Sequence, residues 1–205
     1  MKRVPQRRRS DHAVAIYPGS FDPPTYGHLD LIQRGSRLFE RLEVAILRNP
    51  EKDPLFTIEE RSAMLQTLTR KLGNVHIGTF DGLLVNYARE VKAGTVLRGI
   101  RAISDYEYEL QMALMNRKLE PTLETVFMPA AEIYSYVSSR LVKEIVRLGG
   151  KVTSVVPPLV EEHLQRKLNG KTAPPAAPPR ATTARGGGPG GSQRAAVRSR
   201  AQIQS

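Results

Sequence analysis

The chain has 205 residues, no cysteine, no tryptophan and a formal net charge of +11, and its length suits one domain with a single core. The absence of cysteine excludes disulfides, thiol nucleophiles and cysteine-based zinc sites. The chain contains no run of 18 apolar residues, so we expect no membrane span. The excess charge lies at the ends: residues 1–12 carry +4 and residues 170–205 carry +6, whereas residues 13–169 contain 20 basic and 19 acidic side chains.

The composition predicts three segments. Residues 170–205 are mostly Ala, Pro, Gly, Ser, Thr and Arg, so burial of apolar surface cannot offset the entropy of ordering them. We therefore expect a disordered basic tail at 170–205, a basic N-terminal extension at 1–12 and one folded domain at 13–169. The extension is not followed by the apolar segment of a signal peptide, which predicts a cytoplasmic protein.

Short apolar runs alternate with helical patterns along the expected domain. Strands are predicted at residues 13–16, 42–47, 75–79, 95–97 and 123–128. Strands separated by helix-sized connections pair in parallel, with helices on both faces of the sheet. The expected fold class is α/β, a single doubly wound, Rossmann-like domain with a five-stranded parallel sheet.

Polar residues mark the expected helix starts. Thr57 with Glu60, and Ser104 with Glu107, have the spacing of a capping box. Asp81 is expected to cap the helix between them. Ligands of such folds bind beyond the carboxyl ends of the strands, so the loops that leave those ends are the candidates for chemistry.

The loop after the first strand reads Y-P-G-S-F-D-P-P-T-Y-G-H. Gly19 and Gly27 let the backbone approach a bound group. His28 falls in the first turn of the next helix, where unpaired amides and the helix dipole attract phosphate. A lone histidine at a helix start can also be purely structural.

Two further strings follow strand ends. Arg98-Gly99-Ile100-Arg101 places two bidentate donors around a glycine, which suits a substrate with several phosphates, although paired arginines also occur on solvated surfaces. The string Y-S-Y-V-S-S-R ends in Ser138, Ser139 and Arg140. Ser138 or Ser139 is expected to cap a helix, and the same helix start can bind an anion.

Neither G-x-G-x-x-G nor G-x-x-x-x-G-K-[ST] occurs in the chain. Instead, Y-P-G-S-F-D-P-x-T-x-G-H, R-G-[I/L]-R and the serine pair resemble the phosphopantetheine adenylyltransferase family of nucleotidyltransferases, in the same order and spacing, from about Val14 to Leu168. The chain departs from the family pattern at Ser20, which is commonly Thr, at Tyr26, and at Arg140, where a third hydroxyl residue commonly lies.

The resemblance implies transfer of an adenylyl group from ATP to 4'-phosphopantetheine, giving dephospho-coenzyme A and pyrophosphate, by a homohexamer. It implies His28 as the catalytic residue and Mg2+ as the cofactor, with no side chain assigned as a metal ligand. The ATP-binding residues that it implies are Ser20, Phe21, His28, Gly99, Ile100, Arg101, Glu109, Tyr134, Ser135, Tyr136, Val137, Ser138, Ser139 and Arg140. The substrate-binding residues that it implies are Ser20, Lys52, Leu84 and Arg98.

Two alternatives stay open at this point. A nucleotidyltransferase of the same superfamily could use nicotinate mononucleotide or glycerol 3-phosphate as its acceptor. A nucleic-acid-binding module could use the basic ends, but residues 13–169 are nearly neutral and no RNA-stacking motif is evident. We therefore expect ATP and 4'-phosphopantetheine as partners, and neither a membrane nor a specific nucleic acid.

Overall fold

The computed structural model of the chain describes residues 13–48 and 53–169. The predictions for residues 1–12, for Lys52 and for residues 170–205 lie outside the described residues. Among the described residues, no helix combines the length and the apolar composition needed to cross a membrane.

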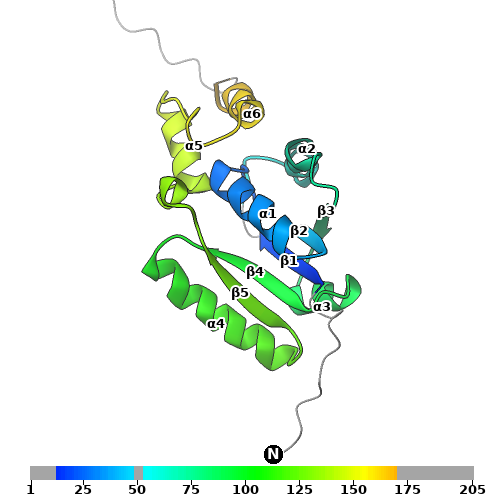
Figure 1. The fold of residues 1–205 in the computed structure, drawn as a ribbon. Coiled ribbons are helices and arrows are strands. Elements are labelled where there is room, and N and C mark those ends of the chain that lie inside the picture. Colours follow the sequence, from blue (N-terminus) through cyan, green and yellow to red (C-terminus); the bar gives the residue numbers. More distant parts are fainter. Residues whose placement is uncertain (1–12, 49–52, 170–205) are drawn as a thin grey trace, which may run out of the picture. The chain divides into compact units, whose positions relative to one another are not determined.

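Five parallel strands form the central sheet, in the order β3-β2-β1-β4-β5 (Figure 1). Their bounds are β1 Val14–Gly19, β2 Arg41–Leu47, β3 Val75–Phe80, β4 Thr95–Ile100 and β5 Glu124–Pro129. β2 and β3 are added on one side of β1, and β4 and β5 are added on its other side. The predicted five-stranded parallel sheet is confirmed, and its strand order reverses between β1 and β4, which is where such sheets bind ligands.

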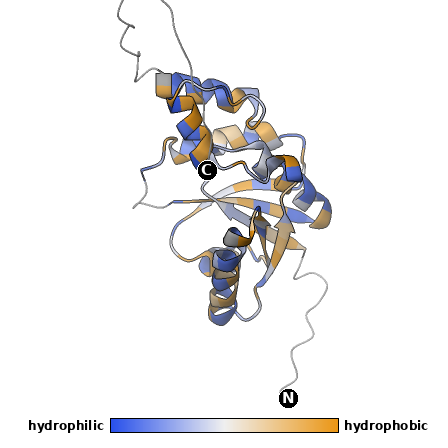
Figure 2. Cartoon of the chain, turned by 90° about the vertical axis from the view of Figure 1, so that its left-hand side faces the viewer, coloured by the Kyte–Doolittle hydropathy of each residue, from blue (hydrophilic) through white to orange (hydrophobic). Residues whose placement is uncertain are grey.

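Helices cover both faces of the sheet, as predicted. Their bounds are α1 Tyr26–Leu38, α2 Ile58–Thr69, α3 Leu84–Glu90, α4 Ile103–Leu119, α5 Ser139–Arg147 and α6 Pro158–Asn169, with a 3-10 turn at Glu132–Tyr134. Side chains alternate along each strand, so Ala15 and Tyr17 of β1 pack with α1 and α2, whereas Ile16 packs with α3. In Figure 2 the strands carry mainly apolar colours, and the helices around them show both hydrophobic and hydrophilic residues.

A third apolar cluster joins α5 and α6 to the segment before α2. Phe56 and Met64 pack there with the valines and leucines of the last two helices, including Val142 and Leu164. The start of α5 also contacts the loop that follows β1, where Oγ of Ser139 donates to the carbonyl of Pro23. The carboxyl edge of the sheet is therefore bordered by elements from both ends of the domain.

Two of the predicted helix starts are confirmed. Thr57 and Glu60 form the predicted capping box: the Thr57 N–H donates to Glu60 over 2.8 Å, and the Glu60 N–H donates to Oγ1 of Thr57 over 3.3 Å. Ser138 caps α5, where its Oγ accepts a hydrogen bond from the N–H of Leu141.

The other two predicted starts are wrong. The N-cap of α3 is Leu83, which makes no side-chain cap hydrogen bond. Gly82, with φ +73°, turns the chain between Asp81 and this helix. The carboxylate of Asp81 lies 3.8 Å from Nε of Arg48. α4 begins at Ile103 with Ala102 as its N-cap, so Ser104 lies inside the helix and is not its cap. In both cases the predicted cap, Asp81 or Ser104, lies one to three residues from the first residue of the helix.

Candidate active site

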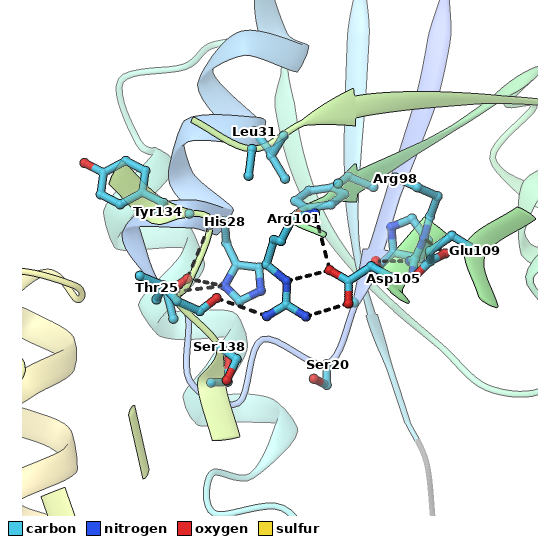
Figure 3. A pocket seen from close by; sticks show the side chains of 18 residues that line it. Ser20, Thr25, His28, Leu31, Arg98, Arg101, Asp105, Glu109, Tyr134 and Ser138 are labelled. Carbon is cyan, nitrogen blue, oxygen red and sulfur yellow. Dashed lines mark hydrogen bonds and ion pairs between the residues drawn. The ribbon is translucent and has the colours of Figure 1, made fainter. Parts of the chain in front are cut away.

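A cavity of about 330 Å³ lies over the carboxyl ends of β1 and β4, at the point where the strand order reverses. Its walls come from the end of β1, the start of α1, the end of β4, the start of α4 and the segment that leads into α5. Figure 3 shows His28 and Thr25 on one side, Arg98 and Glu109 on the other, and Arg101 with Asp105 between them.

His28 is held by a capping box in which it takes the place of the usual Glu or Gln. Thr25 is the N-cap of α1, and its backbone N–H donates to Nδ1 of His28 over 3.0 Å. In return, the N–H of His28 donates to Oγ1 of Thr25 over 3.4 Å. Because Nδ1 accepts a hydrogen bond from an amide, the proton of the neutral ring must lie on Nε2.

The imidazole of His28 is neutral at pH 7. Burial, together with the positive charge of Arg101, lowers the pKa of His28 to about 4. The start of a helix also opposes a positive charge. The ring makes an edge-to-face contact with the ring of Phe21, with centroids 5.1 Å apart. His28 therefore offers a hydrogen-bond donor without a positive charge at the cavity wall.

Arg101 follows β4 directly and is anchored on both sides. Its Nε and Nη2 donate to the carboxylate of Asp105, at 2.9 and 3.1 Å, and its Nη1 donates to the carbonyl of Val137 at 3.1 Å. Burial raises the pKa of Asp105, but the hydrogen bonds and charge of Arg101 outweigh that effect and lower the pKa below its ordinary value. The guanidinium is thus fixed beside His28 (Figure 3).

Arg98 lies within β4 and forms a bidentate pair with Glu109 of α4. Its Nε donates to Oε2 over 2.6 Å, and its Nη2 donates to Oε1. Its Nη1 donates to the carbonyl of Pro18 in β1, over 2.8 Å. The two side chains are only 27% and 12% exposed, so Arg98 is held firmly where β1, β4 and α4 meet.

Comparison with known proteins identifies the family of the chain. The cytidylyltransferase-like family matches residues 16–145. The phosphopantetheine adenylyltransferase of Caldanaerobacter subterraneus subsp. tengcongensis is 53% identical over 154 residues, which cover 75% of this chain and 96% of that protein. The enzyme of the same name from Nostoc punctiforme is 56% identical over 145 residues, covering 71% and 79%. The chain belongs to the phosphopantetheine adenylyltransferase family.

A solved structure supports the fold alone. Nicotinic acid mononucleotide adenylyltransferase of Plasmodium falciparum, complexed with NaAD, superposes with a TM-score of 0.56 at 16% identity, covering 77% of this chain and 96% of that chain. The doubly wound sheet of this family member is therefore shared with a nucleotidyltransferase of distant sequence.

Most of the residues predicted from the sequence lie around this one cavity. Those that line it are Ser20, His28, Arg98, Gly99, Arg101, Glu109, Tyr134, Val137, Ser138 and Ser139. Phe21 lies behind the wall, fully buried, and a Cβ on Gly19 would lie 2.9 Å from its ring. The small size of Gly19 is thus needed for internal packing. Ile100, Ser135 and Tyr136 are outside the lining of this cavity.

Two neighbouring cavities, each of about 350 Å³, share Ser20 with the main one. The first is bounded by Arg98 and Glu109 and by apolar side chains, and it contains Leu84. The second is bounded by charged side chains, and it contains Arg140. Leu84 and Arg140 therefore lie in two cavities that adjoin the main one, and their predicted roles in binding stay predictions.

Several residues that position the site were not predicted from the sequence, among them Asp105, Asp22 and Lys143. Asp105 orients Arg101, and its only sequence signal is its position four residues after that arginine. Asp22 lies within the first motif but received no role, and it is 5% exposed. Lys143 binds Asp22, and nothing in the helical pattern of α5 distinguishes it from a surface lysine.

The described residues contain no group of three or more His, Cys, Asp or Glu side chains that could hold a metal ion. The nearby carboxylates of Asp105 and Glu109 are each engaged by an arginine. A divalent cation in this cavity would therefore take its ligands mainly from a bound polyphosphate and from water.

Proposed function

We propose that this protein transfers an adenylyl group from ATP to 4'-phosphopantetheine, forming dephospho-coenzyme A and releasing pyrophosphate. Membership of the family supports the reaction. The observation that carries it at the level of the site is the neutral Nε2–H donor of His28 beside the fixed guanidinium of Arg101, in the cavity where the strand order reverses.

The reaction requires positioning rather than acid–base chemistry. The acceptor phosphate is already an anion, so its oxygen can attack the α-phosphorus of ATP without a general base. A P–O bond forms on one side, and the bond to the bridging oxygen of the β-phosphate breaks on the other, so that pyrophosphate leaves with the electron pair. Negative charge on the α-phosphoryl oxygens must be stabilised by donors that are already in place.

We assign that stabilisation to His28. Its Nδ1 is occupied by the N–H of Thr25, so the ring is oriented before substrate binds and its Nε2–H is available to a phosphoryl oxygen. A neutral donor can strengthen its hydrogen bond as charge develops, and it does not bind the ground-state polyphosphate with a full positive charge. The main-chain amides at the start of α1 add to the same field.

The two arginines are preorganised for separate phosphates. A guanidinium has five N–H donors, and in the hydrogen bonds of the described residues Arg98 and Arg101 each use three. Two donors on each remain for a ligand. Their carboxylate partners fix the guanidinium planes, so little side-chain entropy is lost when a phosphate binds. We assign Arg101 to ATP and Arg98 to the acceptor phosphate.

The apolar cavity beside Arg98 suits the pantetheine arm. Its walls include the hydrophobic side chains Leu47, Phe80, Leu83, Leu84, Val96 and Met112. Arg98, Glu109 and Ser20 line both this cavity and the main one. An acceptor with its phosphate at Arg98 and its arm along these side chains would meet ATP at the shared boundary.

Three further assignments complete the proposal. We propose that Mg2+ binds with ATP and neutralises the departing pyrophosphate, and that the protein works in the cytoplasm, where both substrates are available. We also propose the homohexamer implied by the family. α4 supports self-association because large apolar side chains outside the two substrate cavities are exposed along it, namely Ile103, Tyr106, Leu114, Met115 and Leu119.

One assay separates this function from its rivals. Pyrophosphate release from ATP should be measured with 4'-phosphopantetheine, nicotinate mononucleotide or glycerol 3-phosphate as the acceptor, with Mg2+ present. Rapid release only with 4'-phosphopantetheine supports the proposal. Faster release with another acceptor would reassign the substrate, and the absence of release with all three would refute adenylyl transfer.

A further inference from the structure

The carboxylate of Asp22 joins three segments that are far apart in the sequence. It is 5% exposed and accepts hydrogen bonds from the backbone N–H groups of Leu55, at 3.0 Å, and Phe56, at 2.9 Å. Its third partner is Nζ of Lys143 in α5, at 2.6 Å. Asp22 thus connects the loop after β1, the segment before α2 and the first half of α5.

The ion pair between Asp22 and Lys143 is buried, with side-chain exposures of 7% and 19%. Removal of one partner from such a pair leaves an uncompensated charge in a poorly solvated place. The Arg166–Glu162 pair of α6 has the same separation of 2.6 Å, but its side chains are 67% and 65% exposed. Exposed pairs contribute little, so Arg166 provides a matched control.

A second contact ties α5 to the same loop. Ser139, the first residue of α5, donates from its Oγ to the carbonyl of Pro23 over 2.8 Å. Ser139 and Ser20 both line the main cavity. The loop that contains Asp22 leads directly into α1, which carries His28. The start of α5 and the loop after β1 therefore form adjoining walls of one site, joined by two polar contacts.

Arg61 supports the loop from the side of α2. It is 4% exposed and donates from Nη1 to the carbonyl of Ser20, at 2.8 Å, and from Nε to that of Thr57, at 3.2 Å. Arg61, Asp22 and Lys143 line the same charged cavity. The backbone carbonyl of Ser20 is thus held by a buried arginine that does not line the main cavity.

We infer that Asp22 and Lys143 are positioning residues for adenylyl transfer. Their ion pair sets the distance between the loop that carries Ser20 and the start of α5, and thereby aligns the acceptor with the α-phosphate of ATP. This inference rests on the proposed function. An in-line attack requires close alignment, and a misplacement of about 1 Å can reduce the rate by roughly 10²-fold. Neither residue contacts the reacting atoms in this role.

The first experiment compares Lys143→Met, Lys143→Arg and Asp22→Asn with the control Arg166→Met. We expect kcat to fall by about 10-fold or more in Lys143→Met and Asp22→Asn. The dissociation constant for ATP alone, measured by equilibrium dialysis, should change by less than about threefold, because the pair acts on alignment. Lys143→Arg keeps the charge and should recover most of kcat, and Arg166→Met should match the wild type.

Two results would overturn the inference. In the first, Lys143→Met weakens ATP binding enough to account for its whole loss of activity, whereas the kcat of Asp22→Asn stays near that of the wild type. Lys143 would then be a direct ligand of the phosphates. The other is a folded Lys143→Met protein with unchanged kcat. If Lys143→Met does not fold, the double variant Asp22→Asn/Lys143→Met removes the unpaired charge and is measured in its place.

A second experiment needs no substrate and so separates this inference from the proposed function. Amide hydrogen exchange at Leu55 and Phe56 should be faster in Lys143→Met than in Arg166→Met, because their acceptor loses its anchor. Unchanged exchange refutes the positioning role even if the wild type is fully active. Faster exchange in a protein that releases no pyrophosphate would support the connection between the segments and refute only the proposed reaction.

Discussion

Substitution of His28 separates its structural role from its chemical one. The side chain accepts the N–H of Thr25 in a capping box and also presents Nε2–H to the cavity. His28→Ala removes both functions. The lost cap should lower the free energy of unfolding by about 1 kcal/mol, and the lost transition-state donor should lower kcat by roughly 10² to 10³-fold.

Two other variants keep the cap and change only the chemistry. Gln and Glu are the usual residues at this position of a capping box, so His28→Gln and His28→Glu should unfold in urea close to the wild type. Gln retains an N–H donor and should keep part of the activity. Glu places a negative charge beside the polyphosphate, and its kcat should be the lowest of the series.

The assay is pyrophosphate release at saturating ATP and 4'-phosphopantetheine, combined with urea denaturation of each variant. The order of activity should be wild type, then Gln, then Ala, then Glu, whereas stability should place Ala last. A folded His28→Ala protein with near wild-type kcat would refute the reasoning, and His28 would then be only the cap of α1.

Three other predictions follow from the site and the charge distribution. Arg98→Ala should weaken binding of 4'-phosphopantetheine and Arg101→Ala that of ATP, each by about 10- to 100-fold in calorimetry; equal, small effects on both ligands would contradict the assignment. Because the pKa of His28 is lowered to about 4 from 6.5, the unfolded state binds the proton more readily. The contribution of His28 to the free energy of unfolding should be complete above pH 6.5 and decline as the pH falls toward 4. The difference in unfolding free energy between wild type and His28→Gln, measured across this pH range, should decline in the same way. A difference that does not change with pH would exclude a buried neutral ring. Removal of residues 1–12 and 170–205 should leave pyrophosphate release unchanged and abolish salt-sensitive retention on DNA, whereas loss of catalysis in the folded product would show that the ends belong to the site.

The sequence predicted those features that depend on neighbouring residues. The alternation of apolar runs and helices was enough for the order of elements, and the Thr57–Glu60 spacing was enough for one capping box, because both partners lie within one helical turn. Asp81 failed as a cap because Gly82 redirects the chain with a positive φ. Glycine tolerates this conformation, but its presence alone does not show on which residue the next helix begins.

The candidate site was predictable to the extent that its residues follow strand ends. His28, Arg98 and Arg101 could be located in this way, since the carboxyl ends of parallel strands meet at one edge. The residues that orient them could not all be found. Lys143 lies 121 positions after Asp22, and only the packing of α5 against the first loop brings the two charges together.

The two arginines illustrate how the fold converts sequence spacing into geometry. Arg98 and Arg101 lie three positions apart at the end of β4, and their partners Glu109 and Asp105 lie four positions apart on α4. Four residues of helix correspond to about 6 Å along its axis, so the two guanidinium groups are held on one face of α4, about a turn apart. Each guanidinium also donates to a backbone carbonyl, that of Pro18 for Arg98 and that of Val137 for Arg101. α4 supplies one carboxylate to each guanidinium, so the two positive charges are balanced before any phosphate binds. This pairing is consistent with the nearly equal numbers of basic and acidic side chains in residues 13–169, and it leaves two N–H donors on each arginine for a polyphosphate.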